Sequence, residues 1–497
     1  MKFHCISFDY NNSNDYERLI YVLKQSVESY GGLIEHKVPS PSEKNKINSN
    51  YNKIKYQIEI LKNEKEPFVF IDGDTVLLGD ISNVFDDDFD IAFTERSETS
   101  PIPINVGVVF CRPSYKLEKF FNEWYEAVDF FYKNPDELKP YLNVHKGICQ
   151  SGLGKILEKE HDLKIKYLPC SIYNACEDDW KDKIPDDCKV IHLKNESVQK
   201  QLLHGGSLRY PHINRVFFKY KTTPSTAEMV KFKKRTGYNL DIINPKTFNE
   251  KIAWKKHNDR NPLIVETSDK VLVRNYVKEK GFNEILTELL YIAETPKDIK
   301  VIPGCVLKSS HGSGQSIIMN PKMSKISLKT KVKKFLKGTY NSHMGEWAYQ
   351  LLKPQILVEK MISDTPASCI KALCFHGSPK YFYYQDYDIN FKPISISLYD
   401  DDWVLQNVKM NSKGISFGSP LKNKLIDKPV NLNYIKEVCC KLSEDFQFVR
   451  VDLMVVDDKI YFSELTHYPT CGMMRFEPQD WDLKLGELWD INKKVES

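Results

Sequence analysis

Two carboxylates directly follow a short apolar run near the start of the chain. Residues 67–71 read Pro-Phe-Val-Phe-Ile and are followed by Asp72-Gly73-Asp74. In an extended strand, residues i and i+2 point to the same side, so we expect Asp72 and Asp74 to face one cation. Carboxylate oxygens suit Mg²⁺ or Mn²⁺, and such a cation suits a diphosphate. The alternative is an acidic turn after a strand, because Asp-x-Asp is a common tripeptide.

A second candidate site joins a lysine to a loop of small residues. Lys308 ends the apolar run 305–308 and is followed by Ser-Ser-His-Gly-Ser-Gly-Gln-Ser at 309–316. Glycines let backbone N–H groups approach phosphate oxygens, and the lysine supplies a point charge. The spacing is neither that of a Walker A loop nor that of the dinucleotide-binding fingerprint. An ordinary hairpin loop is the alternative interpretation.

Two acids in the last part of the chain lie inside apolar runs. Asp452 lies within 449–455 and Glu464 within 460–465, and the turn at 457–459 between them predicts a β-hairpin. An unpaired carboxylate in an apolar strand is costly, so we expect the two acids to share a Mg²⁺ across adjacent strands. The alternative is two acids on a solvated face of the sheet.

Composition limits the kinds of protein that this chain can be. Of its 497 residues, 41% are hydrophobic and 28% charged, which excludes a disordered or fibrous chain. The formal charge of +4 gives no support for a nucleic-acid binder. No apolar run reaches the ~18 residues of a membrane-spanning helix. The first residues lack a signal peptide's apolar core, so we expect a cytoplasmic protein, with a peripheral position at the inner membrane face left open.

The cysteines indicate reduced thiols. There are 12, and none forms a Cys-x-x-Cys pair. In a chain of this length, scattered cysteines favour buried thiols over a disulfide framework or a zinc site.

The sequence also predicts the strands, helices and domains that carry these candidate residues. Apolar runs at 2–8, 33–38, 67–71, 91–94 and 106–110 alternate with helical patterns at 15–30 and 52–62, which predicts an α/β domain with a largely parallel sheet. A stretch rich in Gly, Pro, basic and aromatic residues follows and predicts a linker. We therefore expect domains at 1–204 and 229–497, joined by a linker at 205–228. The second domain opens with helical patterns at 247–256 and 269–280 and continues with β-rich runs.

The N-terminal half resembles the GT-A family of nucleotide-sugar glycosyltransferases, over about residues 1–200. The likeness rests on Asp72-Gly73-Asp74 as the family's DxD motif and on Asn105-Val106-Gly107 as its N-x-G segment. The resemblance implies a Rossmann-like mixed sheet, a Mn²⁺ or Mg²⁺ ion and a nucleotide-sugar, with a UDP-sugar expected. It also implies a sugar pocket formed by Asn105 and Gly107, and in some branches a metal-ligating histidine, here His192. A core strand with a bulge and a structural histidine are the alternatives for these residues.

The C-terminal half resembles the ATP-grasp superfamily, most closely its TupA-like branch, over about residues 229–490. Matching segments in the right order are PKTFNEKI at 245–252, SDKVLVRNYV at 268–277, LKSSHGSG at 307–314 and FSELTHYP at 462–469. The resemblance implies a fold of two subdomains that binds ATP and Mg²⁺.

This second resemblance also implies roles for individual residues. Nucleotide-binding residues would be Lys270, Lys308, His311, Gly312, Ser313, Gly314 and Glu359, the last at the adenine–ribose hinge. Lys371 and Arg450 would face the phosphates or an acyl phosphate, and Asp452 and Glu464 would hold Mg²⁺. Many ATP-grasp enzymes carry Asn two residues after this Glu, whereas here the residue is Thr466.

Together the two resemblances imply a bifunctional enzyme of capsule or cell-surface polysaccharide synthesis. The N-terminal domain would transfer a sugar from a nucleotide-sugar to a polysaccharide acceptor. The C-terminal domain would join a carboxylate, expected to be a uronic acid, to a small amine or amino acid through an acyl phosphate. Three alternatives stay open: a ligase whose N-terminal domain binds a nucleotide-sugar without transfer, a non-catalytic carbohydrate-binding scaffold, and an ATP-grasp enzyme that phosphorylates rather than ligates.

Overall fold

The chain folds into two compact units, and each is described by itself. The computed structural model describes residues 1–7, 15–38, 46–96, 103–142, 147–204, 210–337, 344–388, 393–410 and 425–493. The first unit consists of residues 1–203 and 212–223, and the second consists of residues 204–211 and 224–497. Among the described residues, no helix has the length and apolar character needed to cross a membrane.

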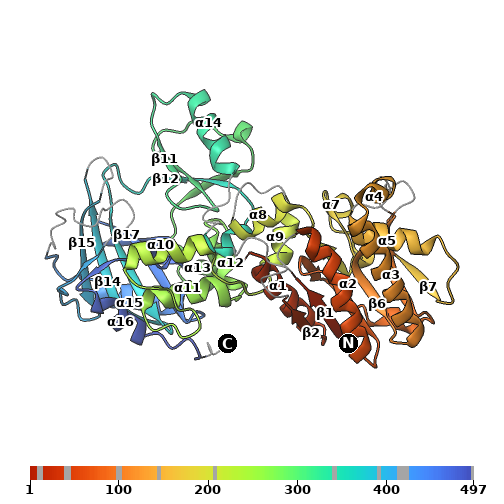
Figure 1. Ribbon diagram of the computed structural model, residues 1–497. Helices are drawn as coiled ribbons and strands as arrows, with labels where there is room; N and C mark the ends of the chain where they lie inside the picture. Colours follow the sequence, from red (N-terminus) through yellow and green to blue (C-terminus); the bar gives the residue numbers. More distant parts are fainter. Residues whose placement is uncertain are drawn as a thin grey trace. The chain divides into compact units, whose positions relative to one another are not determined.

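The first unit is built on a six-stranded mixed sheet in the order β2-β1-β3-β6-β5-β7 (Figure 1). Its strands are β1 (Lys2–Ile6), β2 (Leu33–Lys37), β3 (Phe68–Ile71), β5 (Ile91–Glu95), β6 (Ile104–Cys111) and β7 (Ile165–Pro169). Strand β1 runs parallel to β2 and β3, and β5 runs parallel to β7. Strand β6 is antiparallel to both of its neighbours. The sheet is therefore less parallel than the alternation of strands and helices predicts.

Both faces of this sheet are covered, which explains the continuous apolar runs. All four residues of β3 are buried. Phe68 and Phe70 pack in one hydrophobic core, and Val69 and Ile71 pack in another, as the two-residue period of a strand requires. Helices α2 (Lys46–Asn63), α3 (Tyr115–Lys133) and α5 (Ile148–Leu157) contribute to the first core, and α1 (Asp15–Ser29) to the second.

A separate two-stranded sheet lies beyond the end of β3. Strand β4 (Thr75–Leu77) pairs antiparallel with β8 (Val190–His192), and Thr75 lies opposite His192. The backbone N–H of Leu193 also donates to the carbonyl of Asp74 at 2.8 Å. This pairing places the end of β8 beside the Asp72-Gly73-Asp74 turn, more than a hundred residues away in sequence.

The region where the linker is expected contains helices. Helix α8 (Glu196–His204) precedes it, α9 (Pro211–Phe217) lies within it, and residues 205–209 lie outside the described residues. The Arg18 guanidinium donates to the carbonyls of Leu203 and Thr223, at 2.7 and 3.0 Å, and so holds both ends of the segment against α1. These bonds explain why residues 212–223 belong to the first unit, while the domain boundaries at 204 and 229 stay predictions.

The second unit contains two large antiparallel sheets (Figure 1) and a two-stranded pair of β16 (Lys409–Met410) with β19 (Phe476–Glu477). The four-stranded sheet has the order β11-β10-β12-β9, and the five-stranded sheet has the order β15-β14-β13-β17-β18. Strands of the smaller sheet are β9 (Leu289–Ala293), β10 (Cys305–Ser309), β11 (Ser316–Met319) and β12 (Ile356–Lys360). Strands of the larger sheet are β13 (Ser368–Phe375), β14 (Ser378–Tyr387), β15 (Pro393–Asp400), β17 (Phe448–Val456) and β18 (Lys459–Thr466). The hairpin expected around 457–459 is the β17–β18 pair.

Helices of the second unit follow the expected patterns with one shift. Helix α10 (Thr226–Thr236) begins the unit, α14 (Lys325–Leu336) packs with the smaller sheet, and α15 (Leu432–Ser443) packs with the larger one. Helix α11 (Phe248–Asn258) starts at Thr247, which forms a capping box with Glu250. The helix expected from residue 269 begins only at α13 (Val273–Glu279), because the Asp269 carboxylate accepts from the backbone of the two residues before that helix, Val271 and Leu272.

Candidate functional sites

In the first unit, three donor atoms converge at the end of β3. His192 Nε2 lies 3.1 Å from Asp74 Oδ1 and 3.7 Å from Asp72 Oδ2. The ligand atoms of these three residues lie within 4.8 Å of one another. The two aspartates do not converge by the alternation of a strand, as expected from the sequence. Asp72 follows β3 and the next two residues form a turn before β4, so the turn brings the carboxylates together.

Hydrogen bonds of Asn174 fix the orientation of the His192 ring. The side-chain NH₂ of Asn174 donates to Thr94 Oγ1 at 2.8 Å and to the carbonyl of Asn105 at 3.3 Å. Its Oδ1 therefore faces His192 Nδ1, at 2.8 Å, and accepts the proton of that nitrogen. In a neutral imidazole, Nε2 then carries only a lone pair, directed at the carboxylates. With Nε2 unprotonated, a divalent cation would supply the positive charge that the three acceptors need, and without a cation a second proton on Nε2 would donate to Asp74 Oδ1.

Gly107 is required by the close approach of His192. A Cβ on Gly107 would lie 2.3 Å from His192 Cε1 and 3.1 Å from Asp72 Oδ2. The register of β6 against β5 shifts here, between Phe93 and Thr94, so the glycine lies in a bulge. Its carbonyl accepts from the backbone N–H of Asp72 at 2.8 Å. Gly107 can therefore lie in a β-bulge and also belong to the candidate site beside His192.

A cavity of about 140 Å³ adjoins Asp72. Asp72, Asn105 and Gly107 line it, together with Lys53 and Lys194. Lys53 Nζ lies 2.5 Å from Asp72 Oδ1, and Lys194 Nζ donates to Asn105 Oδ1 at 2.7 Å. Neither lysine is among the residues expected from the sequence. Lys194 follows His192 by two residues, which is a weak signal, whereas Lys53 lies in α2 with nothing in its sequence context to mark it.

The environment keeps Asp74 ionised. Burial alone would raise the pKa of its carboxyl, but His192 and Lys194 outweigh burial and lower the pKa to about 2. Gln199 Nε2 also donates to Asp74 Oδ2 at 3.0 Å. The site therefore offers a charged carboxylate at neutral pH.

In the second unit, Glu359 on β12 gathers three partners. Its carboxylate accepts from Arg274 Nη1 at 2.8 Å and from Thr287 Oγ1 at 2.6 Å, and Lys308 Nζ lies 2.8 Å away on neighbouring β10. Burial would raise the pKa of Glu359, but Lys308 and Arg274 outweigh it and hold the pKa below its usual value. Arg274 and Thr287 are not among the residues expected from the sequence. Arg274 lies inside a segment that carries the family likeness, which is the signal that could have found it.

A cavity of about 310 Å³ lies next to this group. Lys308 and Glu359 line it from the smaller sheet, and Cys369, Tyr387 and Met454 line it from the larger sheet. Its volume is at the lower end of the range of small-molecule sites, and most of its lining is apolar. The cavity can hold a flat heterocycle with polar groups at one edge.

The small-residue loop after β10 is fixed on both sides. Lys270 Nζ donates to the carbonyl of Gly312 at 2.6 Å. His311 is buried, and its ring contacts Ser309 Oγ at 3.1 Å and the carbonyl of Phe335 at 3.0 Å. Gly314 has a positive φ of 68°. The loop 312–314, which includes Ser313, therefore lies beside Lys270, while the His311 ring anchors it to the rest of the smaller subdomain.

The two acids of the hairpin lie directly opposite each other. Asp452 on β17 pairs with Glu464 on β18, at a register shift that follows Asp452. Arg450 makes a bidentate contact with Asp452, with Nε and Nη2 each 2.6 Å from a carboxylate oxygen. Lys371 Nζ lies 3.5 Å from Asp452 Oδ2, and Lys270 Nζ lies 3.6 Å from Glu464 Oε2. The structure thus brings all five of these predicted residues together.

Thr466, two residues after Glu464, joins this network. Its hydroxyl donates to Glu464 Oε1 at 3.2 Å and accepts from Arg450 Nη2 at 3.0 Å. Burial alone would raise the pKa of Glu464, but Lys270, Arg450 and Lys371 outweigh it and lower the pKa to about 2. Asp452 and Glu464 with three cationic side chains beside them form a site where a metal ion and phosphates could replace the internal ion pairs.

Family models match both halves of the chain. Residues 23–201 match the model for nucleotide-diphospho-sugar transferase, and residues 250–490 match the model for TupA-like ATP-grasp. No curated protein matches the sequence at a significant level.

Solved structures similar to the chain fall into the same two groups. One is a glycosyltransferase involved in glycosylation of the major capsid of PBCV-1, with 10% identity and a TM-score of 0.31 over 40% of this chain and 100% of that one. A second is the glycosyltransferase GlyE of Streptococcus pneumoniae, with 14% identity and a TM-score of 0.28 over 39% of this chain and 54% of that one. A third is D-alanine–D-alanine ligase from Helicobacter pylori, with 14% identity and a TM-score of 0.28 over 45% of this chain and 61% of that one.

The family assignments rest on the two model matches, which lie in separate parts of the sequence. The match at 23–201 includes Asp72, Asp74 and His192, and the match at 250–490 includes Lys308, Asp452 and Glu464. The chain is therefore an enzyme in which a member of the nucleotide-diphospho-sugar transferase family is followed by a member of the TupA-like ATP-grasp family.

Proposed function

We propose that the chain carries two activities, glycosyl transfer in the first unit and carboxylate–amine ligation in the second. The observation that supports this most is that each unit has its own pair of neighbouring carboxylates with lysines beside them. Burying charged groups is costly, so carboxylates paired with lysine and arginine favour a catalytic site over a scaffold that only binds carbohydrate.

For the first unit, we assign the cation to Asp72, Asp74 and His192. A divalent ion held there would neutralise the diphosphate of a nucleotide-sugar. Lys53, now 2.5 Å from Asp72, would be released to pair with a phosphate. Asn105 and Lys194 line the cavity beyond the carboxylates and would bind hydroxyl groups of the transferred sugar. We expect a UDP-sugar donor with Mn²⁺ or Mg²⁺.

For the second unit, we assign ATP to the cavity between the two sheets. Its base would lie against Tyr387 and Met454, and Lys308 would reach the phosphates. Asp452 and Glu464 would hold Mg²⁺, which neutralises charge on the transferred phosphoryl group. Lys371 and Arg450 lie on the strands that carry or flank these acids and would stabilise the negative charge of the reacting carboxylate and phosphate. An amine would then displace phosphate from the acyl phosphate.

The substrates follow from the presence of both activities in one chain. We propose that the ligase acts on a sugar carboxylate, with a uronic acid as the expected class, and on a small amine or amino acid. The product would be an amidated capsule or cell-surface polysaccharide. Both ATP and nucleotide-sugars are cytoplasmic, so we place the enzyme there, with a peripheral position at the inner membrane face as the alternative.

The experiment is a grid of acids against amines with purified protein and Mg-ATP. Free and nucleotide-linked uronic acids form one axis, small amines and amino acids the other, and ADP release is measured. We expect ADP only where one acid and one amine are both present. ADP that appears with the acid alone, with a stable phosphorylated product, would instead identify a kinase-like reaction.

Two variants separate the activities. Glu464→Ala should abolish ADP release and leave transfer from the nucleotide-sugar unchanged. Combined Asp72→Ala and Asp74→Ala substitutions should abolish transfer and leave ADP release unchanged. If the double variant loses nucleotide-sugar binding but the native protein transfers no sugar to any acceptor, the first unit only binds the nucleotide-sugar, and the ligase-only alternative is correct.

A further inference from the structure

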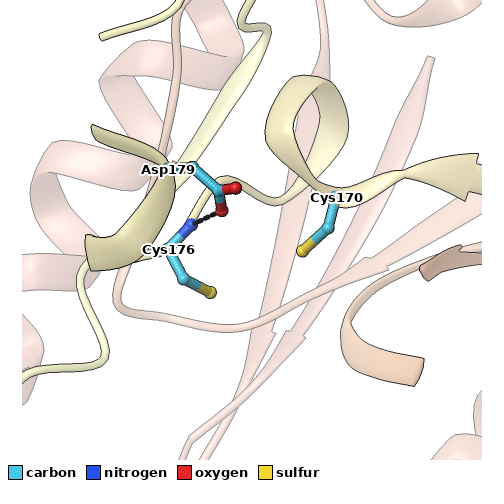
Figure 2. A group of neighbouring side chains, drawn as sticks. All are labelled: Cys170, Cys176 and Asp179. Atoms are coloured by element: carbon cyan, nitrogen blue, oxygen red, sulfur yellow. Dashed lines mark hydrogen bonds between the residues drawn. The ribbon is translucent and has the colours of Figure 1, made fainter. Parts of the chain in front are cut away.

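Two cysteines of the first unit, Cys170 and Cys176, lie close together (Figure 2). Cys170 begins α6 (Cys170–Tyr173), and Cys176 precedes α7 (Glu177–Trp180). The two sulfurs and a carboxylate oxygen of Asp179 lie within 4.8 Å of one another. Both cysteines are buried, with 2% and 6% of their surface exposed. Their spacing in sequence predicts neither a pair nor a metal site.

Hydrogen-bond donors converge on the sulfur of Cys176. Arg96 Nη2 and Asn105 Nδ2 each lie 3.3 Å from it and direct an N–H toward it. Neither group can accept a proton, so Cys176 Sγ is the acceptor in both contacts. The carbonyl of Asn174 lies 3.0 Å from Cys170 Sγ and farther, at 3.5 Å, from Cys176 Sγ, so it is the better acceptor for the Cys170 thiol. The proton of the pair is therefore best placed on Cys170 and the negative charge on Cys176.

The charges around the two cysteines also favour a thiolate at Cys176. The interaction with Cys170 lowers the pKa of the Cys176 thiol, and His192, Lys194 and Arg96 lower it further, against the opposing effect of burial. The same interaction, together with burial, raises the pKa of Cys170. A thiolate beside a protonated thiol is the pairing that reacts with oxidants and then closes a disulfide.

The surroundings suit an anion better than a metal ion. The Arg96 guanidinium is directed at Cys176, where it would oppose a cation. Asp179 Oδ2 already accepts from the backbone N–H of Cys176 at 2.8 Å, as the dashed line in Figure 2 shows. We propose that Cys170 and Cys176 form a reversible oxidation site, in which the Cys176 thiolate reacts with a peroxide and Cys170 completes a disulfide.

The chemistry balances with a peroxide as the oxidant. The Cys176 thiolate attacks one oxygen of hydrogen peroxide, the O–O bond breaks, and hydroxide leaves as Cys176 becomes a sulfenic acid. The Cys170 sulfur then attacks Cys176 Sγ, the S–O bond breaks, and the second hydroxide leaves as the S–S bond forms. The two hydroxides take up the thiol protons, so two thiols and one peroxide give one disulfide and two waters.

The site is coupled to the metal-binding residues through two asparagines. Asn174 lies between the two cysteines in the chain, and its side chain holds the His192 ring at 2.8 Å. Asn105 spans both sites, because its Nδ2 contacts Cys176 while its Oδ1 accepts from Lys194 and from the backbone of Gly107. A disulfide removes the negative charge that Asn105 and Arg96 bind, and it constrains the segment that carries Asn174. Oxidation should therefore weaken cation binding at the transferase site.

The test follows the thiols by mass spectrometry. Trypsin cleaves after Lys166 and Lys181, so both cysteines lie on the single peptide 167–181. Reduced full-length protein is treated with roughly equimolar hydrogen peroxide, quenched by alkylation and digested. We expect this peptide to appear unalkylated and two hydrogens lighter, at a rate at least about tenfold above the loss of alkylation at Cys188. Cys188 is the matched control, since it is also 6% exposed but burial raises its pKa to about 12.

Variants separate the two thiols. Cys170→Ser should stop at a sulfenic acid on Cys176 that dimedone traps, and Cys176→Ser should leave Cys170 unmodified. Equal oxidation of Cys188, faster reaction at Cys170, or stoichiometric zinc binding that needs both cysteines would overturn the proposal.

The coupling is measured as Mn²⁺ affinity by electron paramagnetic resonance, and only this readout rests on the proposed function. We expect the disulfide form to bind Mn²⁺ about tenfold more weakly than the reduced form, with recovery on reduction. A disulfide that forms without changing Mn²⁺ affinity would overturn the coupling. If the reduced protein binds no Mn²⁺ at all, the proposed metal site fails, while the mass measurement still decides the oxidation site.

Discussion

At the scale of single residues, the candidate metal site of the first unit depends on a side-chain amide whose orientation is set by its hydrogen-bond partners. The Asn174 amide can face His192 in only one orientation, because its NH₂ group is committed to Thr94 and to the carbonyl of Asn105. That choice leaves His192 Nε2 as a ligand directed at the two aspartates. Partners of this kind, one step removed from a metal, contribute substantially to its affinity.

Asn174→Leu should therefore weaken Mn²⁺ binding by about 10- to 100-fold, because His192 Nδ1 loses its acceptor and the ring loses its fixed tautomer. Mn²⁺ affinity is measured by titration with detection of the free ion. Asn122→Leu is the control, since Asn122 Nδ2 donates to a backbone carbonyl within α3 and touches neither site. An Asn174→Leu variant that folds normally and binds Mn²⁺ as tightly as the native protein would show that the ring needs no such support.

At the scale of elements, α10 and α11 are joined by charges buried within the second unit. Glu228 on α10 lies 2.5 Å from Lys256 Nζ and 3.0 Å from His257 Nε2 on α11, and all three side chains are buried. Burial would raise the pKa of Glu228, but the attraction of Lys256 and His257 outweighs it and lowers the pKa to about 2. These ion pairs hold α10 against α11.

Glu228→Gln should lower the free energy of unfolding by about 3–5 kcal/mol, because Lys256 is left as an uncompensated buried charge. Thermal unfolding followed by circular dichroism measures the change. Glu294→Gln removes one partner of an exposed pair with Lys353 and should shift the transition much less.

The Glu228 carboxylate also makes the free energy of unfolding depend on pH. The folded pKa of Glu228 lies below its unfolded value of about 4.3, so its contribution is fully present above that value and is lost as pH falls toward about 2. The native protein should lose stability over this acid range, and Glu228→Gln should lose less. Parallel losses in both proteins would mean that other carboxylates dominate the acid transition.

At the scale of the whole molecule, the two units each have their own core and their own candidate site. Hydrophobic clusters of the first unit involve residues up to Val190, and those of the second begin at Phe232. A ligand that binds only the folded form of one unit stabilises that unit by mass action.

Calorimetry should accordingly show ligand-specific shifts. Mg-ATP at about 100 times its dissociation constant should stabilise the second unit by about 2.7 kcal/mol, and a UDP-sugar with Mn²⁺ should stabilise the first. Asp72→Ala with Asp74→Ala should remove only the effect of the UDP-sugar, and Glu464→Ala only that of Mg-ATP. A single transition that both ligands shift equally would show that the units unfold as one.

Sequence patterns determined much of the architecture. Apolar runs and turn residues located the strands that carry or precede candidate residues, such as β3, β10, β17 and β18, within one or two residues, because burial leaves continuous hydrophobic stretches. The turn residues at 457–459 were enough to place Asp452 and Glu464 on adjacent strands, β17 and β18, because a short turn fixes the register of the strands that it joins. Matching segments in the right order indicated the ATP-grasp family, and the DxD motif with the N-x-G segment indicated the nucleotide-sugar transferase family.

Only the tertiary structure decided which residues complete each site. The β4–β8 pairing brings His192 to Asp74, and α2 brings Lys53 to Asp72, across separations that no local pattern records. Arg274 reaches Glu359, and Asn174 fixes His192, through hydrogen bonds that exist only once the chain has folded. The Cys170–Cys176 pair belongs with these, because proximity and the donors of Arg96 and Asn105, rather than spacing, distinguish a reactive thiolate from a buried thiol. Sequence sets the elements by local burial and turn geometry, whereas site chemistry depends on contacts between elements that are distant along the chain.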